Sequence, residues 1–360
     1  MRGGMTNRKR RRAGGGLALA AALALSAGCG SAPAVDAATG PYARPGRLVE
    51  LEDGRRINLR CVGRGAPTVI LESGFGAGSA AWGKVQPKLA DVTRVCAYDR
   101  AGYGFSDPGP LPRDGPAIAR DLDAALTRAG IEGPFVVVGH SAGGLYGRLF
   151  AGRRPGEVQG LVLVDPTIEG RARPGADGLE GIRRRVRRCL AAAETDPQPP
   201  ADDPQWAGCV SARADARTRE IARSPLTWRS QLSELDSIFG RTSEAVVRLG
   251  SLLDNVPIYV ITASDTAAAA QQVGFDKPVS LWELQHVRLA LSSRGGSQRT
   301  VLSSHLVMND RPEVIVEAVA AMVRAARAGL PPDPLPLSET ASAVGEEFEA
   351  IFGEIPDPTK

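Results

Sequence analysis

The pentapeptide Gly139-His140-Ser141-Ala142-Gly143 carries the strongest chemical signal in the sequence. A G-x-S-x-G pattern marks a serine nucleophile when an apolar strand enters it and a helix leaves it. Both conditions hold, because the β-branched run Phe135–Val138 precedes the pentapeptide and the helical pattern Leu145–Gly152 follows it. The turn that presents such a serine is strained and crowded, so glycine is needed on both sides. We therefore predict that Ser141 is a nucleophile between a strand and a helix.

A serine hydroxyl needs a general base, and the chain has only three histidines. His140 lies inside the pentapeptide, where its backbone is committed beside Ser141, and this favours a structural role. His286 falls in the middle of a helical pattern, which favours packing or a surface position. His305 follows the last strand-like run and precedes the closing helix, so it can reach the serine from the end of a sheet strand. We predict that His305 is the base.

The elements that must position these residues are short β-branched runs alternating with helical patterns. The strand-like runs are Leu48–Leu51, Ile57–Cys61, Thr68–Leu71, Val92–Tyr98, Phe135–Val138, Leu161–Val164, Val256–Thr262 and Thr300–Leu302. The helical patterns are Ala117–Ala129, Leu145–Gly152, Val279–Leu291 and Arg311–Ala328. Asp53-Gly54 between the first two runs predicts a hairpin. The alternation predicts an α/β fold, with a mostly parallel twisted sheet of about eight strands and helices on both faces.

One long segment interrupts this alternation. Residues 167–254 are rich in arginine, contain Pro-rich loops and have no strong strand pattern. We predict a helical cap inserted after the sixth strand. Within it, Trp228, Leu232, Leu235 and Phe239 recur at helical spacing, and we interpret this stripe as the cap's own core rather than a substrate wall.

The chain then divides into six segments. They are a signal peptide (1–28), a flexible tether (29–46), the first part of the sheet domain (47–166), the cap (167–254), the second part of the sheet domain (255–330) and an acidic flexible tail (331–360).

The first thirty residues are typical of an export signal. The basic stretch Arg8–Arg12 precedes the apolar run Leu17–Leu25, which is shorter than the roughly 20 residues of a membrane span. Leu25-Ser26-Ala27-Gly28-Cys29 resembles a bacterial lipobox, which predicts a lipid on Cys29 and anchoring at the extracytoplasmic face of the membrane. An ordinary signal peptide with a secreted product is the alternative.

The charge and the motifs of the sequence bear on whether the protein binds nucleic acid, a metal or a cofactor. The formal net charge is +4, but residues 1–28 carry six basic residues and no acidic one, so their removal leaves −2. This balance gives no reason to expect nucleic acid as a partner. Neither a Cys-x-x-Cys nor a His-x-x-x-His pattern occurs, and there is no phosphate loop, so we expect no metal and no cofactor. The oligomeric state is left open.

Residues 47–328 resemble the α/β-hydrolase superfamily in the order of their features. The first strands are followed by the strand–serine–helix turn at residues 139–143 (the nucleophile elbow), the inserted segment and the late histidine, His305. Two loops add to the resemblance, namely Glu72-Ser73-Gly74-Phe75-Gly76 after the third strand and Asp99-Arg100-Ala101-Gly102-Tyr103-Gly104-Phe105-Ser106-Asp107 after the fourth. The resemblance implies an oxyanion hole made by the backbone N–H groups of Phe75 and Ala142. We interpret the second loop as structural.

The resemblance leaves two candidates for the acid that orients His305. In the superfamily this acid usually follows the seventh strand, where Thr262-Ala263-Ser264-Asp265 offers Asp265. Some members place it after the sixth strand, where Asp165 stands in Val164-Asp165-Pro166. We favour Asp265 and keep Asp165 as the alternative.

The resemblance also selects a disulfide pairing. Apart from Cys29, four cysteines remain, and an exported protein meets an oxidising compartment. The second and fourth strands are neighbours in the superfamily's sheet, which implies Cys61–Cys96, while Cys189 and Cys209 both lie in the insertion and are expected to pair with each other. The alternative for Cys61 and Cys96 is a pair of buried free thiols.

We therefore interpret the chain as a serine hydrolase that cleaves a small-molecule carboxylic ester through an acyl-enzyme. A peptidase or amidase of the proline-iminopeptidase type is the alternative among enzymes. A lipoprotein that keeps the fold but only binds ligands is the alternative outside them. A serine at position 141 excludes the superfamily members that use aspartate there, the dehalogenases and epoxide hydrolases.

Overall fold

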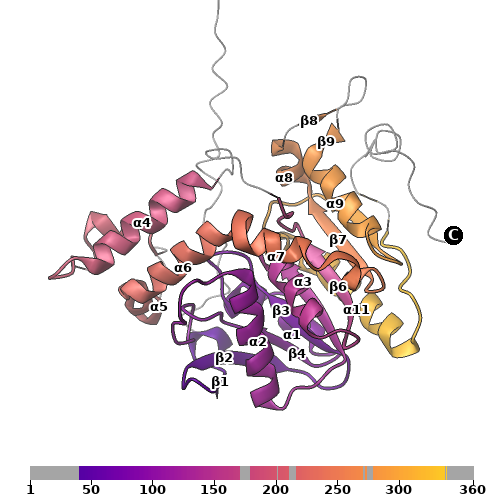
Figure 1. Cartoon of the computed structure of the whole chain (residues 1–360), viewed down its shortest axis with the longest axis horizontal. Helices are drawn as coiled ribbons and strands as arrows, with labels where there is room; N and C mark the ends of the chain where they lie inside the picture. The colour runs from indigo at the N-terminus through magenta and orange to yellow at the C-terminus, as the bar shows by residue number, and fades with distance from the viewer. Residues whose placement is uncertain are drawn as a thin grey trace, which may run out of the picture. The chain divides into compact units, whose positions relative to one another are not determined.

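An eight-stranded sheet forms the centre of the computed structural model, which describes residues 40–170, 179–200, 202–210, 216–270, 272–273, 279–336 and 338 (Figure 1). Its order is β1-β2-β4-β3-β5-β6-β7-β10, with bounds β1 Arg47–Glu50, β2 Arg56–Val62, β3 Thr68–Glu72, β4 Val95–Tyr98, β5 Phe135–His140, β6 Val158–Val164, β7 Ile258–Ala263 and β10 Ser297–Val301. Within this eight-stranded sheet, only the β1·β2 and β2·β4 pairs are antiparallel. The predicted fold class is confirmed.

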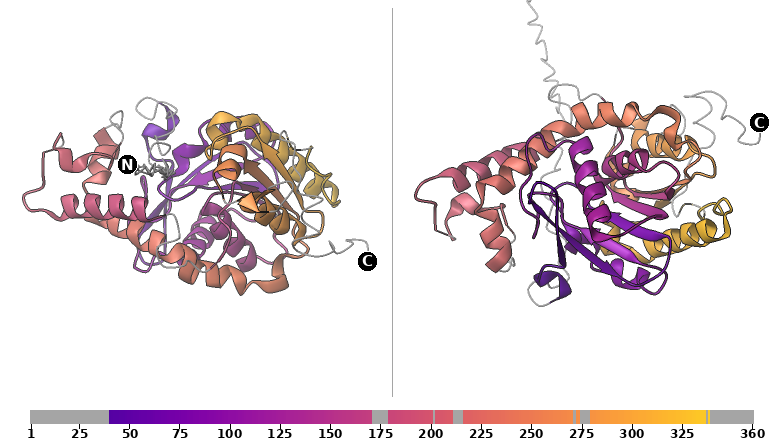
Figure 2. Two further views of the ribbon diagram at one scale, coloured as in Figure 1. Left: turned by 90° about the horizontal axis from the view of Figure 1, so that it is seen from above. Right: turned by 60° about the horizontal axis from the view of Figure 1, so that its bottom comes forward.

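Helices cover both faces of the sheet because its central strands are apolar on both sides. All six residues of β5 are buried, with Phe135 and Val137 packing on one face and Val136 and Val138 on the other. Figure 2 shows the yellow helix α11 (Pro312–Ala328) on the side of the sheet opposite the magenta helices. The remaining helices of the sheet domain are α1 Gln86–Leu89, α2 Gly115–Ala129, α3 Gly143–Arg153, α8 Ser264–Ala269, α9 Leu281–Leu291 and α10 Val307–Asp310.

The described part of the insertion is helical, as predicted. It contains α4 Glu180–Glu194, α5 Ala216–Ala222, α6 Pro225–Ser237, a π-helical turn at Ile238–Thr242 and α7 Ser243–Val247. Short 3-10 turns lie at Pro41–Ala43, Ser79–Trp82, Pro204–Trp206 and Gly250–Leu253.

The apolar stripe of the insertion serves two cores. Trp228 and Leu232 pack in a small cluster within the cap, together with Val186 and Cys189 of α4. Leu235 is buried in the main core beneath the cap, and Phe239 packs against that core. The prediction of a core for the cap alone therefore holds for Trp228 and Leu232, whereas Leu235 and Phe239 join the cap to the core of the sheet domain.

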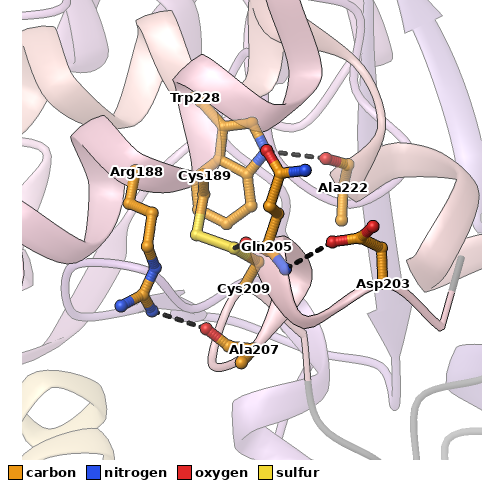
Figure 3. Close-up of a disulfide and its surroundings, with 8 residues drawn as sticks. All are labelled: Arg188, Cys189, Asp203, Gln205, Ala207, Cys209, Ala222 and Trp228. Carbon is orange, nitrogen blue, oxygen red and sulfur yellow. Dashed lines mark hydrogen bonds between the residues drawn. A yellow bond between two sulfur atoms is a disulfide. The ribbon is translucent and has the colours of Figure 1, made fainter. Parts of the chain in front are cut away.

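Two disulfides confirm the predicted pairing. Cys61 and Cys96 lie directly opposite each other on β2 and β4, with their Cα atoms 4.0 Å apart. Cys189 of α4 is bonded to Cys209, with Cα atoms 5.6 Å apart, beside the ring of Trp228 (Figure 3). The alternative of free thiols at Cys61 and Cys96 is wrong, because direct strand pairing brings the two side chains together.

The described ends of the chain differ from the predicted tether and tail. Tyr42 is buried and donates its hydroxyl to Gln86 Oε1 at 2.7 Å. Leu335 N donates to Ser297 Oγ at 2.9 Å, and the hydroxyl of Ser338 accepts from Thr300 N at 2.9 Å. These residues are held by hydrogen bonds to the sheet domain. The predicted signal peptide, Cys29 and most of the predicted tail lie outside the described residues.

One helix begins later than predicted. Val279–Ser280 forms strand β9 and pairs with β8, Gln272–Val273, in a separate two-stranded sheet. Helix α9 starts at Leu281 because Ser280 caps it, with Oγ accepting from Glu283 N at 3.5 Å.

The described residues include neither a membrane-spanning helix nor a cluster of metal-binding side chains. No helix among them combines the length and apolar character needed to cross a bilayer. In the same part of the chain, no group of three or more His, Cys, Asp or Glu side chains is arranged to hold a metal ion.

Candidate active site

Ser141 lies on a strained turn between β5 and α3. Its φ is +52°, a left-handed value that is rare for residues other than glycine. A Cβ added at Gly139 would lie 2.6 Å from Gly143 O, and one added at Gly143 would lie 2.5 Å from Glu72 O. The turn therefore requires glycine at both positions, and it fixes the serine at the carboxyl end of the sheet.

His305 is held by Asp165. His305 Nδ1 lies 2.6 Å from Asp165 Oδ2, while Asp165 Oδ1 accepts from Ala263 N at 3.2 Å and from Trp282 Nε1 at 2.9 Å. Asp165 is fully buried at the end of β6, with a φ of +41°. Burial alone would raise its pKa, but the hydrogen bond and charge of His305, the charge of His286 and the Trp282 hydrogen bond lower it to about 2. The carboxylate is therefore ionised and fixes one ring nitrogen of His305.

The preference for Asp265 is corrected by this geometry. Asp265 is exposed in the first turn of α8, where its Oδ1 accepts from Ser264 Oγ at 3.3 Å. Because β7 ends at Ala263 and α8 starts at Ser264, no loop carries Asp265 toward His305. The neighbouring strand β6 supplies the carboxylate instead.

His140 contacts both the backbone and the ring of His305. His140 Nε2 lies 2.9 Å from the carbonyl oxygen of His305, and the two rings are 4.6 Å apart. Burial, followed by the charge of His305, lowers the pKa of His140 to about 3. The neutral ring fits the structural role expected from the sequence.

The loop after β3 lies against the serine. A Cβ added at Gly74 would be 3.1 Å from Ser141 Cβ and 2.8 Å from His140 Nδ1. The next residue is Phe75. Among the described residues, neither Phe75 N nor Ala142 N finds a hydrogen-bond acceptor, and Ser141 Oγ forms no hydrogen bond with His305. Within the described residues, these two backbone donors are therefore unused.

The known proteins to which this chain is similar indicate one fold. A family model described as alpha/beta hydrolase fold matches residues 67–210. A haloalkane dehalogenase DbeA loop variant from Bradyrhizobium elkanii superposes with a TM-score of 0.58 at 19% identity, covering 78% of this chain and 97% of that chain. A thermophilic esterase from Thermogutta terrifontis gives a TM-score of 0.54 at 19% identity, covering 77% and 97%. This chain has the α/β-hydrolase fold.

Curated relatives match over shorter stretches. An uncharacterized protein of Schizosaccharomyces pombe is 43% identical over 81 residues, which are 22% of this chain and 15% of that relative. The chain therefore spans a small part of that relative's length. The family model and the solved structures agree on the α/β-hydrolase fold.

Sequence reasoning missed Trp282 and assigned His286 only to packing or the surface, yet Trp282 contacts Asp165 and His286 contacts the next residue, Pro166. Trp282 and His286 are four residues apart on α9, so they share one face of the helix, with their rings 4.8 Å apart. His286 is fully buried, with Nε2 2.9 Å from Pro166 O and Nδ1 2.9 Å from Thr262 Oγ1, and burial lowers its pKa. The i, i+4 spacing of two ring donors was the available signal. Together they hold the Asp165 carboxylate and the turn that follows it.

Proposed function

We propose that this protein is a serine hydrolase that cleaves a carboxylic ester through an acyl-enzyme intermediate. The observation that carries the proposal is the strained Ser141 turn beside His305, whose Nδ1 is held by the buried Asp165.

The first half-reaction is acyl transfer to the enzyme. His305 Nε2 accepts the proton of Ser141, and the serine oxygen attacks the ester carbonyl carbon. The carbonyl oxygen becomes an oxyanion, to which the N–H groups of Phe75 and Ala142 donate. The N-terminus of α3 adds a favourable dipole, since it begins directly behind the serine. Collapse of the intermediate breaks the ester bond, and His305 returns its proton to the leaving alcohol.

The second half-reaction repeats the same steps with water. His305 removes a proton from water, the resulting hydroxide attacks the acyl-enzyme, and Ser141 leaves as the protonated alcohol. Asp165 stays ionised throughout, because its pKa is held at about 2. Its role is to keep the proton of neutral His305 on Nδ1 and to stabilise the imidazolium that forms.

We further propose that the protein is exported and carries a lipid on Cys29. The two disulfides support an oxidising compartment, because such bonds persist outside the cytosol. Anchoring at the membrane would place the enzyme near small esters outside the cell.

A fluorophosphonate probe tests the nucleophile. Wild type should be labelled at Ser141 and should hydrolyse p-nitrophenyl esters, while Ser141→Ala should lose both the labelling and nearly all turnover. Ser251→Ala, which changes an exposed serine of the 3-10 turn Gly250–Leu253, should behave like wild type. A wild-type protein that resists the probe would instead be a ligand-binding relative.

The bond cleaved is tested separately. A series of acyl esters of increasing chain length is compared with aminoacyl amides at equal concentration. Faster turnover of the amides would favour the peptidase or amidase interpretation over the ester proposal.

A further inference from the structure

The buried guanidinium of Arg100 donates all of its hydrogen bonds to one group of neighbouring acceptors. Its side chain is 2% exposed, and Nη1 donates to Glu72 Oε1 at 2.8 Å and to Ser73 O at 2.6 Å. Nη2 donates to Gly74 O at 2.8 Å and to Glu234 Oε1 at 3.0 Å, and Nε donates to Glu234 Oε2 at 3.3 Å. A guanidinium has five N–H donors, so every one is engaged. Two acceptors are carbonyls of the loop that precedes Phe75.

These contacts fix the direction of the Phe75 N–H group. Gly74 O and Phe75 N belong to one planar trans peptide, so the carbonyl and the N–H point in opposite directions. Because the carbonyl is held on Arg100, the N–H must point away from Arg100. Gly74 has no side chain to restrict this peptide, so the restraint has to come from a neighbour.

We propose that Arg100 is a positioning residue that aims the Phe75 N–H group at the oxyanion. Arg100 and its partners Glu72, Ser73, Gly74 and Glu234 are called the clamp, and Glu234 connects it to the cap. The inference rests on the proposed function, since it assumes that Phe75 N stabilises an oxyanion formed at Ser141. It adds a role for the loop after β4, which the sequence indicated only as structural.

The surroundings make the clamp rigid. Tyr98 donates its hydroxyl to Glu72 Oε2, and Tyr146 donates to Glu234 Oε1 at 3.1 Å. The rings of Tyr103 and Tyr146 lie 4.7 and 5.3 Å from the guanidinium carbon. Both carboxylate side chains are 1% exposed, so water does not compete for these bonds.

The cap contributes directly to the clamp. Glu234 lies on α6 of the insertion, whereas Glu72 ends β3 of the sheet. On the same helix, Ser230 approaches Gly102 so closely that an added Cβ would lie 2.4 Å from its Oγ. The side chain of Phe75 packs against both the main core and the cap cluster. A displacement of α6 therefore acts on the oxyanion loop through Glu234.

Arg100→Lys is the decisive variant. Lysine keeps the charge but has three donors and no planar fork, so it cannot hold both carbonyls and both carboxylates. Arg148→Lys is the matched control, because Arg148 is also largely buried and ion-paired, but its partner is Glu169. Glu234→Gln removes the charge of the cap's partner while keeping its shape. All variants are made in the full chain and compared at equal folded fraction.

Three measurements distinguish a role of Arg100 in positioning the Phe75 N–H group from a role in stabilising the fold. They are kcat and KM for a p-nitrophenyl ester, inhibition by an aryl trifluoromethyl ketone, and hydrogen exchange of the segment 72–78. Arg100→Lys should lower kcat and ketone affinity at least about tenfold with KM little changed, since an oxyanion donor is worth about 10²–10³ in kcat. Glu234→Gln should shift the same quantities less, and Arg148→Lys should leave them unchanged. Exchange in 72–78 should rise in the same order.

The outcomes distinguish the two proposals. Wild type without labelling or turnover would overturn the proposed function, while faster exchange in Arg100→Lys alone would still support the clamp. Unchanged exchange in folded Arg100→Lys would overturn the clamp whatever the activity. An active Arg100→Lys with wild-type kcat and ketone affinity would overturn its role in positioning Phe75.

Discussion

At the scale of single residues, two left-handed backbone positions define the site. Ser141 and Asp165 have φ values of +52° and +41° and lie at the ends of the adjacent strands β5 and β6. Neither is glycine, so the surrounding structure must hold each strained conformation. Ser141 N donates to Val164 O at 3.0 Å, next to Asp165 in the chain. The proposed nucleophile and acid are therefore positioned by one pair of strands.

The choice of acid gives the first prediction at this scale. Asp165→Asn should lower kcat sharply, because His305 loses the partner that fixes its tautomer, an effect of about 10⁴-fold in serine proteases with this arrangement. Asp265→Asn is the matched control and should change kcat by less than about twofold, since Asp265 is exposed and its carboxylate accepts from Ser264 Oγ. Steady-state hydrolysis of a p-nitrophenyl ester measures both. A mild Asp165→Asn beside a crippled Asp265→Asn would reverse the assignment.

At the scale of elements, the turn that carries Ser141 can form only because α3 approaches β3 and β5 closely. The contacts that an added Cβ would make at Gly143 are to the backbone of Glu72 and Ser73, which cannot rotate away. The same crossing brings the proposed oxyanion loop to the serine. Both the close packing of α3 and the position of the proposed oxyanion loop therefore require that residue 143 has no side chain.

Gly143→Ala should consequently destabilise the protein by about 1–3 kcal/mol, the usual cost of overpacking. Gly181→Ala is the control, because Gly181 lies near the start of α4 with open space around its Cα, and alanine there should be neutral or slightly stabilising. Urea unfolding monitored by circular dichroism measures the difference. Equal midpoints for the two variants would contradict the crowding argument.

At the scale of the whole molecule, buried ionisable groups couple folding to pH in opposite directions. His140 and His286 are buried and have pKa values below the ordinary 6.5. Below pH 6.5 the unfolded chain binds protons that the folded chain does not, so these histidines make stability fall as the pH drops. Burial raises the pKa of Glu72 from 4.5 to about 7, which makes stability rise as the pH drops through that interval.

Because these effects oppose each other in wild type, the contribution of one histidine is measured by comparing the pH dependence of stability in wild type and in His286→Gln. His286→Gln should remove one proton-linked loss of up to about 1.4 kcal/mol per pH unit below 6.5. Its free energy of unfolding should therefore fall less than that of wild type between pH 7.5 and 5.5. Urea midpoints at the two pH values test this. Parallel pH dependences would show that His286 does not titrate differently in the folded and unfolded states.

The proposed lipid anchor is also a property of the whole molecule. Expressed in a bacterium with its first 28 residues, the protein should sediment with membranes, because a lipid chain on Cys29 adds apolar area that partitions into the bilayer. Cys29→Ala should move it to the soluble fraction after export. Membrane association that survives this substitution would refute the lipobox interpretation.

Local patterns were enough to predict the strands and the strand–serine–helix order. The central strands are short apolar runs whose composition indicates burial on both faces, as in Phe135–Val138. The Cys61–Cys96 pairing followed once the second and fourth strands were placed side by side, and the structure confirms it.

Only the tertiary structure decided which groups meet at the ends of those strands. Asp165 and Asp265 both follow a parallel strand, so the sequence offers both, and the choice depends on β7 running directly into α8. Arg100 stood in a loop expected to be structural, and its five contacts come from segments as far away as Glu234. Strand identity is a local property of the chain, whereas the partner of a buried charge is set by long-range packing. For that reason the sequence by itself determined the framework, and the fold determined the network around Ser141.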